Sequence, residues 1–415
     1  IMKCPLPKTT AALSEPERNC ATRRDGSSCN FFRSLGLDYL YVGEGNDYSV
    51  FGCGFCKVKD TSRPTVVHIH TQKGKGYAPA EADREEFHWE MPFDLETGKP
   101  KVDCSGMEDY HSLTGKFLLE KMKEDHTVVA ISSGTPTVIG FTPERRKQAG
   151  RQFVDVGIAE EHAVALASGI AAGGGRPVYG VYSTFIQRCY DQLSQDLCIN
   201  GNPAVITVFM GTVAGMNDVT HLGFFDIPLI SNIPNMVYLA PTCSEEYFAM
   251  LEWAVRQTEY PVAIRVPGVA VVHRKEEFDT DYSELNRYKM TARGETVAIL
   301  ALGSFYDLGQ ALKNKLREES GVEATLINPR YITGLDEPML EELKVGHRIV
   351  VTLEDGVLDG GFGEKIARYY GNSEMRVLNY GLRKEFADRY NLDELMKANR
   401  LTDKQMAEDI AGILE

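Results

Sequence analysis

The sequence has no excess of positive charge and no long apolar run. Its 415 residues include 45 Lys and Arg against 59 Asp and Glu, which gives a net charge of −14. This acidity disfavours nucleic acid and anionic membranes as partners, although a few local cations can still hold a small anionic substrate. Because no apolar stretch is long enough to span a membrane and no signal-peptide pattern opens the chain, we expect a soluble cytoplasmic protein.

Cysteine patterns typical of metal sites are also missing. Five of the nine cysteines fall within the first 56 residues, and Cys53 and Cys56 form a single C-x-x-C pair. One such pair is compatible with a redox site or with half of a zinc site. Since no second pair and no suitably spaced histidines follow, we predict no metal site in this chain.

The length and the patterning predict several domains. Residues 1–34 are irregular, and residues 35–106 contain one clear strand, Thr65–Thr71, before a loop and a linker. Residues 107–275 and 285–415 each alternate apolar strands with helices, which indicates two α/β domains built on parallel sheets. The strands expected in the first of these domains are Thr127–Ile131, Phe153–Ile158, Val178–Tyr182, Ala204–Phe209, Met236–Ala240 and Val262–Val266.

Two acidic residues lie in the connection between an expected buried strand and an expected apolar helix. Glu160 and Glu161 lie in the stretch GIAEEHAV, Gly157–Val164. Burying a carboxylate is costly unless it is paired or neutralised. The pair therefore marks either an exposed helix start or a working site.

Two further segments offer weaker signals. Lys73 and Tyr77 lie in a Lys-Gly loop after a strand, where lysines can neutralise phosphate, but a solvated turn is the more frequent explanation of such a loop. Tyr182, Phe185 and Arg188 follow another strand, at the end where parallel sheets bind ligands. A ring there can stack on a flat heterocycle, yet a core Phe beside a surface Arg explains the pattern at least as well.

Two segments leave equal alternatives. His221, in GMNDVTHLGFFDIPLI, is either an acid or base in a polar loop or a cap of the next helix. Arg265 closes the apolar strand in PVAIRVPG, where an arginine pairs with either a ligand phosphate or a structural carboxylate.

Taken in order, four segments resemble the 1-deoxy-D-xylulose-5-phosphate synthases, thiamine-diphosphate enzymes of the transketolase superfamily. They are HTQKGKGYAPAEAD, GIAEEHAVALASGIA, YSTFIQRCYDQL and THLGFFD, and the resemblance runs from about Phe31 to the C-terminus. It implies a pyrimidine-binding domain over 107–275 and a transketolase C-terminal domain over 285–415. It also implies a homodimer that condenses pyruvate with glyceraldehyde 3-phosphate, with loss of CO2, for isoprenoid, thiamine and pyridoxal synthesis.

The resemblance gives the candidate residues their roles. Glu160 corresponds to the glutamate that contacts N1′ of the aminopyrimidine and so activates the cofactor, whereas Glu161 serves the helix start. Glu160 is thus expected to point inward. Tyr77 and Phe185 correspond to cofactor-contacting aromatic residues. The substrate side is lined by Lys73, His88, Tyr182, Arg188, His221 and Arg265, with His221 and His88 as catalytic groups and Arg265 holding phosphate.

The chain departs from the family pattern in three ways. Met210 stands where many members have a phosphate-binding Arg, and Asn217 stands where many have Asp. The Gly-Asp-Gly signature followed by Asn, which supplies Mg2+ ligands, does not occur, so residues 35–106 are interpreted as a remnant of the diphosphate-binding domain. We further hypothesise that the first 30 residues and 48–54 are out-of-frame translation.

Three functions follow from these observations. The chain is the synthase or its C-terminal two-thirds, which requires Mg2+ and thiamine diphosphate, and we expect weak cofactor binding or none by this chain alone. Alternatively it is one half of a split transketolase-like enzyme, completed by a separate chain. The third alternative is a non-catalytic dimerising remnant, which the retention of Glu160, Phe185 and His221 disfavours.

Overall fold

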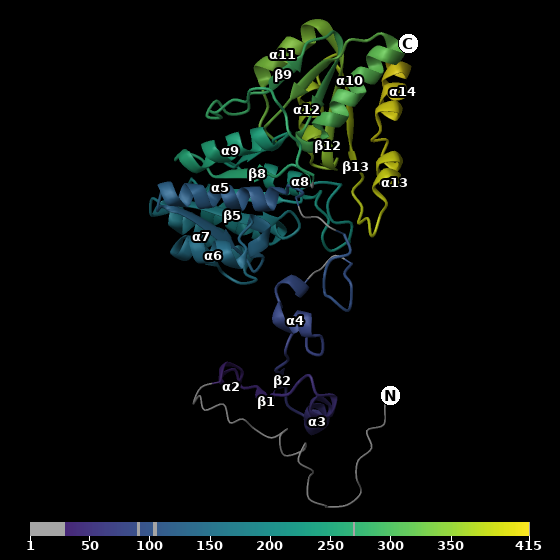
Figure 1. Cartoon of the computed structure of the whole chain (residues 1–415). Helices are drawn as coiled ribbons and strands as arrows, with labels where there is room; N and C mark the ends of the chain where they lie inside the picture. The colour runs from purple at the N-terminus through teal and green to yellow at the C-terminus, as the bar shows by residue number, and fades with distance from the viewer. Residues whose placement is uncertain (1–29, 89–91, 103–105, 269, 415) are drawn as a thin grey trace, which may run out of the picture. The chain divides into compact units, whose positions relative to one another are not determined.

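The computed structural model describes residues 30–88, 92–102, 106–268 and 270–414 (Figure 1). The chain divides into two compact units, residues 1–107 and 108–415, and each unit is described by itself. The hypothesis about the reading frame of residues 1–29 lies outside the described residues. No described helix is long and apolar enough to cross a membrane.

The first unit contains a two-stranded parallel sheet. Strands β1 (Asp38–Val42) and β2 (Thr65–Ile69) pair in register, and the predicted strand at 65–71 is therefore present in shortened form. Helix α3 (Tyr48–Val58) joins them, and its N-terminus is capped by the Asp47 carboxylate. The remaining helical segments are α2 (Phe31–Ser34), α4 (Ala78–Ala82) and the 3-10 turn η1 (Glu86–His88).

The second unit begins with a six-stranded parallel sheet. Its strand order is β4-β3-β5-β6-β8-β7, so all six strands have their carboxyl ends at one edge. The strands are β3 (Val128–Ser132), β4 (Phe153–Asp155), β5 (Arg176–Tyr182), β6 (Val205–Phe209), β7 (Val237–Leu239) and β8 (Val262–Arg265). Every predicted strand of this region is present, with ends that differ by at most three residues.

Helices cover both faces of this sheet, as buried parallel strands require. Helices α5 (Tyr110–Glu124) and α9 (Ser244–Arg256) pack on one face through a core that includes Leu118 and Leu251. Helix α7 (Glu160–Ala172) packs on the other face through a second core with Ala163. The connections between strands also contain the shorter helices α6 (Pro143–Ala149) and α8 (Asp226–Ser231) and the 3-10 turns η2 (Pro136–Ile139) and η3 (Gly150–Gln152).

A π-helix lies beside α7. It covers η5 (Gln192–Cys198), and the Ile199 amide donates to the Ser194 carbonyl five residues earlier, at 3.0 Å. The wider turn places residues five apart on the same face. Leu193 and Cys198 have this spacing and both are buried in the core beneath α7.

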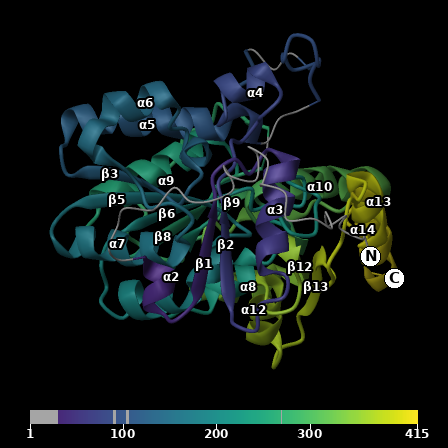
Figure 2. The ribbon, with the colours of Figure 1, turned by 90° about the horizontal axis from the view of Figure 1, so that it is seen from below.

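The C-terminal sheet has five strands in the order β13-β12-β10-β11-β9, of which only β9 is antiparallel. Helices α10 (Tyr306–Ser320) and α14 (Asp403–Leu414) lie side by side on one face (Figures 1 and 2). Helices α11 (Glu337–Gly346) and α12 (Phe362–Tyr370) cover the other face. The strands are β9 (Lys289–Ala292), β10 (Thr296–Ala301), β11 (Thr325–Asn328), β12 (His347–Val357) and β13 (Arg376–Leu382), and α13 (Leu392–Ala398) follows. The prediction of two α/β domains is confirmed.

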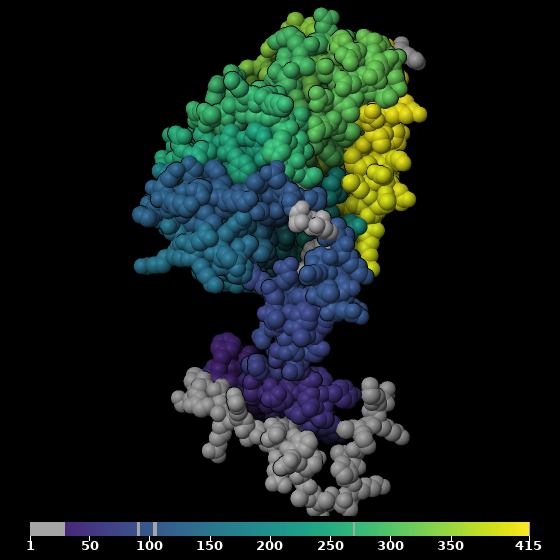
Figure 3. All heavy atoms as spheres, in the orientation of Figure 1, coloured from purple at the N-terminus to yellow at the C-terminus, as the bar shows by residue number. Residues whose placement is uncertain are grey.

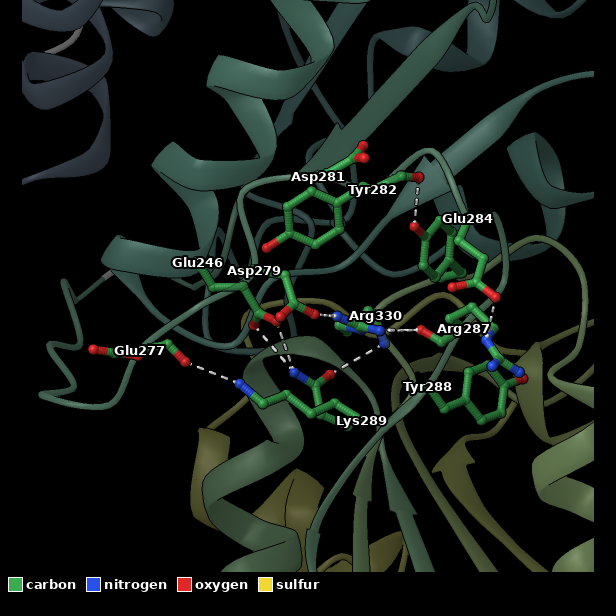
Figure 4. Close-up of polar contacts among 12 residues, drawn as sticks. Glu246, Glu277, Asp279, Asp281, Tyr282, Glu284, Arg287, Tyr288, Lys289 and Arg330 are labelled. Atoms are coloured by element: carbon green, nitrogen blue, oxygen red, sulfur yellow. Dashed lines mark hydrogen bonds and ion pairs between the residues drawn. The ribbon is translucent and has the colours of Figure 1, made fainter.

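Buried polar contacts join the two sheets (Figure 4). Glu246 on α9 is fully buried, and its carboxylate accepts from the Thr242 amide at 2.8 Å and from Asn328 Nδ2 at 2.9 Å. Burial raises the pKa of Glu246, and the Thr242 hydrogen bonds oppose that rise. Arg330 pairs with Asp279 and donates to the Arg287 carbonyl at 2.6 Å. Because Asp279 and Arg287 both belong to the connector between the two sheets, Arg330 anchors that connector at two points.

A second buried acid gives the fold a pH dependence. Glu354 on β12 accepts from the amides of Phe362 and Gly363, both at 2.7 Å, at the N-terminus of α12. Burial raises its pKa from 4.5 to about 7. Between these values the folded protein binds a proton that the unfolded chain lacks, so this group stabilises the fold at low pH and loses that effect as pH rises through 7.

We therefore expect the stability of the wild-type chain to fall, relative to Glu354→Gln, as the pH rises from 4.5 to 7. The relative loss should reach about 3 kcal/mol, which is the free-energy equivalent of the pKa shift. Urea unfolding of both proteins at several pH values measures it. Parallel pH profiles for the two proteins would contradict the assignment.

Candidate functional site

The candidate residues of the second unit gather at the carboxyl edge of the six-stranded sheet. Tyr182 ends β5, and Phe185 follows three residues later. Glu160 begins α7, which follows the end of β4, and the loop with His221 follows β6. Because the strands are parallel, these ends share one edge, which is the usual ligand side of such sheets.

Glu160 lies at the start of α7, where the sequence alone allowed either an exposed helix start or a working site. Its side chain is buried, with 2% of the residue exposed, whereas Glu161 is exposed, so the expected division between the two acids is present. Strand β4 ends earlier than predicted because the Asp155 carboxylate turns the chain, accepting from the amides of Gly134 and Gly157 at 2.9 and 2.8 Å. Gly157 has a φ of 72°, a left-handed value that suits glycine.

Among the described residues, Arg188 is the cation that pairs with Glu160. Arg188, on the 3-10 turn η4 (Ile186–Cys189), places Nη1 3.0 Å from Glu160 Oε2, and its side chain is half exposed. Cys189, next in the chain, has its pKa raised to about 12 by burial, with further contributions from Glu161 and Glu160. The buried Glu160 carboxylate is therefore paired with a guanidinium that reaches solvent.

Removing that cation should destabilise the fold. We expect Arg188→Ala to lower the free energy of unfolding by about 1–2 kcal/mol, less than for a fully buried pair because water screens the half-exposed guanidinium. In a Glu160→Gln background the same change should cost about 1 kcal/mol less. A double-mutant cycle by urea unfolding measures this coupling. Additive effects would contradict the pairing, and Lys384→Ala, which breaks the exposed pair with Asp359, is the control.

Aromatic side chains line the edge beside Glu160. The Tyr182 and Phe185 ring centroids are 5.8 Å apart, and those of Phe185 and His221 are 5.5 Å apart. Burial raises the pKa of Tyr182. Ser183, which lies between Tyr182 and Phe185 in the chain, is 1% exposed, and its Oγ has no hydrogen-bond partner among the described residues. A flat heterocycle with polar edges suits such a row of rings beside an orphaned hydroxyl and a buried carboxylate.

His221 is held within a polar turn. Its Nδ1 is 2.8 Å from Thr220 Oγ1 and 3.7 Å from Asp218 Oδ1. Hydrogen bonds from Thr220 lower the pKa of Asp218, so that carboxylate stays charged beside the ring. Thr184 Oγ1 donates to the Thr220 carbonyl at 3.1 Å, which ties this turn to the Phe185 segment.

Arg265 lies in the interior, paired with protein carboxylates. It is 3% exposed, its Nε donates to Asp226 Oδ2 at 2.7 Å, and its Nη1 pairs with Asp355 on β12. Burial would lower the pKa of Arg265, but the two carboxylates outweigh that effect and raise it. Of the two alternatives that the sequence left equal, the structure contains the structural ion pair, so the expected hold on a substrate phosphate finds no support in this geometry.

Met210 follows β6, the strand that pairs with the Arg265 strand β8. Met210 has a φ of 57°, and a Cβ added to Gly223 would lie 1.8 Å from the Met210 carbonyl oxygen. Asp226 and Asp355 were not singled out from the sequence. Asp226 stands in the otherwise apolar segment FFDIPLI, which is the available signal that a buried acid needs a cation, whereas Asp355 follows Glu354 and gives a weaker one.

The remaining candidates lie in the first unit. The Lys73 ammonium contacts His88 Nδ1, and the Tyr77 hydroxyl donates to the Leu95 carbonyl at 3.1 Å. Tyr77 also packs edge-on against Phe87, with ring centroids 5.6 Å apart. Lys73, Tyr77 and His88 thus lie in one local cluster within the first unit.

Metal binding finds no ready site in the described residues. Cys53 and Cys56 lie on α3, and no group of three or more His, Cys, Asp or Glu within the described ranges could hold a metal ion. The residues present thus suit the flat half of a thiamine-type cofactor, whereas ligands for Mg2+ are not gathered among them.

Comparisons with known proteins agree with this geometry. Residues 108–271 match the family model "Transketolase, pyrimidine binding domain", and residues 287–406 match "Transketolase, C-terminal domain". The 1-deoxy-D-xylulose-5-phosphate synthase of Alkaliphilus oremlandii is 35% identical over 383 residues, covering 91% of this chain and 60% of that protein. The synthase of Clostridium tetani is 33% identical over 386 residues, covering 92% and 61%. The chain spans about 60% of the length of these curated relatives.

Solved structures show the same fold at low identity. A chain described as "Split gene transketolase, inactive beta4 tetramer" has a TM-score of 0.60 and 20% identity, covering 74% of this chain and 98% of that one. A transketolase from Pichia stipitis in complex with a sedoheptulose phosphate has a TM-score of 0.58 and 13% identity, covering 92% and 67%.

Proposed function

Because the chain carries the pyrimidine-binding and C-terminal domains of the transketolase family, we propose that it serves a thiamine diphosphate-dependent condensation of pyruvate with glyceraldehyde 3-phosphate. In that reaction pyruvate loses CO2, and its two remaining carbons join the aldehyde carbon to give a five-carbon sugar phosphate after uptake of a proton. The similarity to curated proteins named 1-deoxy-D-xylulose-5-phosphate synthase supports the choice of these substrates.

One observation carries the proposal: a buried carboxylate next to a row of aromatic rings. When bound, the cofactor supplies a carbanion that accepts the two-carbon unit. Glu160 would hold a proton at the pyrimidine nitrogen, and Phe185 would stack on the pyrimidine ring. The burial of Glu160 would strengthen its hydrogen bond to that nitrogen.

The substrate side is proposed from the same edge. His221 would hydrogen-bond the reacting oxygens, and Tyr182 and Arg188 would border the substrate. We assign Lys73, Tyr77 and His88 to the same reaction on the strength of the family resemblance alone. The proposed Mg2+ ion would require ligands beyond the described residues.

The proposed assembly is a homodimer in the cytoplasm. From Ala163 on, helix α7 is nearly all apolar, yet Leu166 and Ile170 are only partly buried and Gly169 is exposed. Two exposed isoleucines, Ile158 and Ile199, lie at the ends of the neighbouring segments. A second copy would cover this apolar surface.

A specific observation also favours a split enzyme. The chain spans 98% of a protein titled as a split-gene transketolase, but only about 60% of the curated synthases. In this alternative, a separate polypeptide supplies the diphosphate-binding domain.

An activity assay tests both forms of the proposal. The chain is incubated with pyruvate, glyceraldehyde 3-phosphate, thiamine diphosphate and Mg2+, with and without the unmatched part of a curated relative supplied as a second polypeptide. Release of CO2 and a five-carbon product are measured. Turnover by the chain alone supports the synthase, and turnover only in the mixture supports the split enzyme. No turnover in either, with no heat of cofactor binding at millimolar concentration, would leave a non-catalytic dimerising module.

A further inference from the structure

The turn that carries His221 is fastened to the C-terminal domain. Between β13 and α13, residues 386–390 (the strap) lie against residues 213–221 (the His loop). Figure 3 shows the yellow C-terminal residues running along the second unit to its teal part. Four hydrogen bonds join strap and His loop: Arg389 N to the Asn217 carbonyl at 2.6 Å, Asn217 Nδ2 to the Tyr390 carbonyl at 3.1 Å, Val219 N to Asp388 Oδ1 at 3.2 Å, and the Tyr390 hydroxyl to the Val213 carbonyl at 2.7 Å.

The strap adopts a strained backbone to make these bonds. Arg389 has a φ of 47°, a left-handed value that costs a residue with a side chain about 1 kcal/mol. That conformation accompanies the shortest of the four bonds, to Asn217. Phe386 adds an aromatic contact with Phe225, with ring centroids 5.8 Å apart. Strain of this kind persists only where the surrounding contacts outweigh it.

Asn217 is suited to the strap in a way that aspartate is not. Its amide nitrogen donates to the Tyr390 carbonyl, whereas an ionised carboxylate can only accept and would repel that oxygen. The asparagine therefore has a use within the protein, as a tie between the domains.

We propose that the strap positions His221, with Asn217, Asp388 and Tyr390 as positioning residues. Asn217 and Val219 are both fastened, and His221 follows two residues after the second, so the fastened turn fixes where the ring stands. The consequence for catalysis rests on the proposed function, while the fastening itself does not. Binding of the aldehyde substrate would then depend on the C-terminal domain, although His221 belongs to the pyrimidine-binding domain.

Hydrogen exchange tests the fastening in the protein without substrate. We expect Asn217→Asp and Asp388→Ala to speed exchange of the Val219 and Arg389 amides about fivefold, the equivalent of about one lost hydrogen bond. Asp388→Asn keeps an acceptor oxygen for Val219 and should restore most of the protection. Asp393→Ala, an exposed carboxylate on α13 without a contact to the His loop, is the matched control. Unchanged exchange in the first two variants would overturn the proposal.

The NMR signal of the His221 ring tests the positioning itself. Its carbon-bound protons, assigned with His221→Gln, should shift in Asn217→Asp and Asp388→Ala and stay in place in Asp393→Ala. An unmoved signal despite faster exchange would show a tie with no positioning role and would also overturn the proposal. In the active assembly the same two variants should raise KM for the aldehyde about fivefold with little change in kcat. If the wild type shows no turnover, the proposed function fails, and exchange and NMR still decide the positioning.

Discussion

Replacement of Arg265 by methionine is expected to lower the free energy of unfolding by about 3–5 kcal/mol, the usual cost of breaking a buried ion pair. Arg265 and its partners Asp226 and Asp355 are almost wholly buried, and the three come from different segments of the second unit. Without the guanidinium, two carboxylates would face each other in a dry interior. Such charges are not recovered by solvent, so the loss should exceed that of any surface pair in the protein.

Two further variants separate the charge from the shape of that side chain. Arg265→Met combined with Asp226→Asn and Asp355→Asn should recover part of the lost stability, because no unpaired charge remains. Arg265→Lys keeps the charge but loses the forked guanidinium that reaches both acids. Its free energy of unfolding should therefore lie between those of the wild type and of Arg265→Met. Full stability of Arg265→Met with a raised KM for the aldehyde would contradict the structural role and restore the phosphate-binding one.

Glu160→Gln is expected to lower turnover of the assembled enzyme by at least 100-fold, the lower range for loss of acid–base assistance. A glutamine keeps the size and a hydrogen bond but cannot hold or release the proton. Its neighbour offers a matched control, because Glu161→Gln changes the same group at an exposed position one residue later. Steady-state kinetics and urea unfolding are measured for both variants.

The outcome of that comparison separates chemistry from folding. Folding of Glu160→Gln should be nearly normal, since removing a buried charge offsets the lost pairing with Arg188. Near-normal turnover of Glu160→Gln, or an equal loss in Glu161→Gln, would refute the role assigned to Glu160.

Apolar runs in the sequence were enough to predict the architecture of the second unit. Strands such as β5 and β6 are buried along almost their whole length, and this produces continuous apolar stretches between turn residues. Strand β1 and helix α3 were not predicted. Strand β1 alternates poorly, and α3 contains two glycines that disfavour helix in a sequence-based argument.

The site was predictable only where its residues are close in the chain. Glu160 and Glu161 could be separated only through the family resemblance, because the strand-to-helix pattern alone left an exposed helix start and a working site open. The partners of Arg265 could not be found, since Asp226 and Asp355 lie 39 and 90 residues away and only the fold brings them together. The same applies to Asn217, whose partner Tyr390 is 173 residues distant.

The π-helix at 192–198 lets the chain lose a residue without losing its core contacts. Deleting exposed Gln195 would let the segment close into an ordinary α-helix, with better local hydrogen bonding. Leu193 and Cys198 would then stand four residues apart, a spacing that shares a face on an α-helix, so both should keep their core contacts. Arg188 lies four residues before this segment and should keep its pairing with Glu160, so the chain is expected to tolerate this deletion.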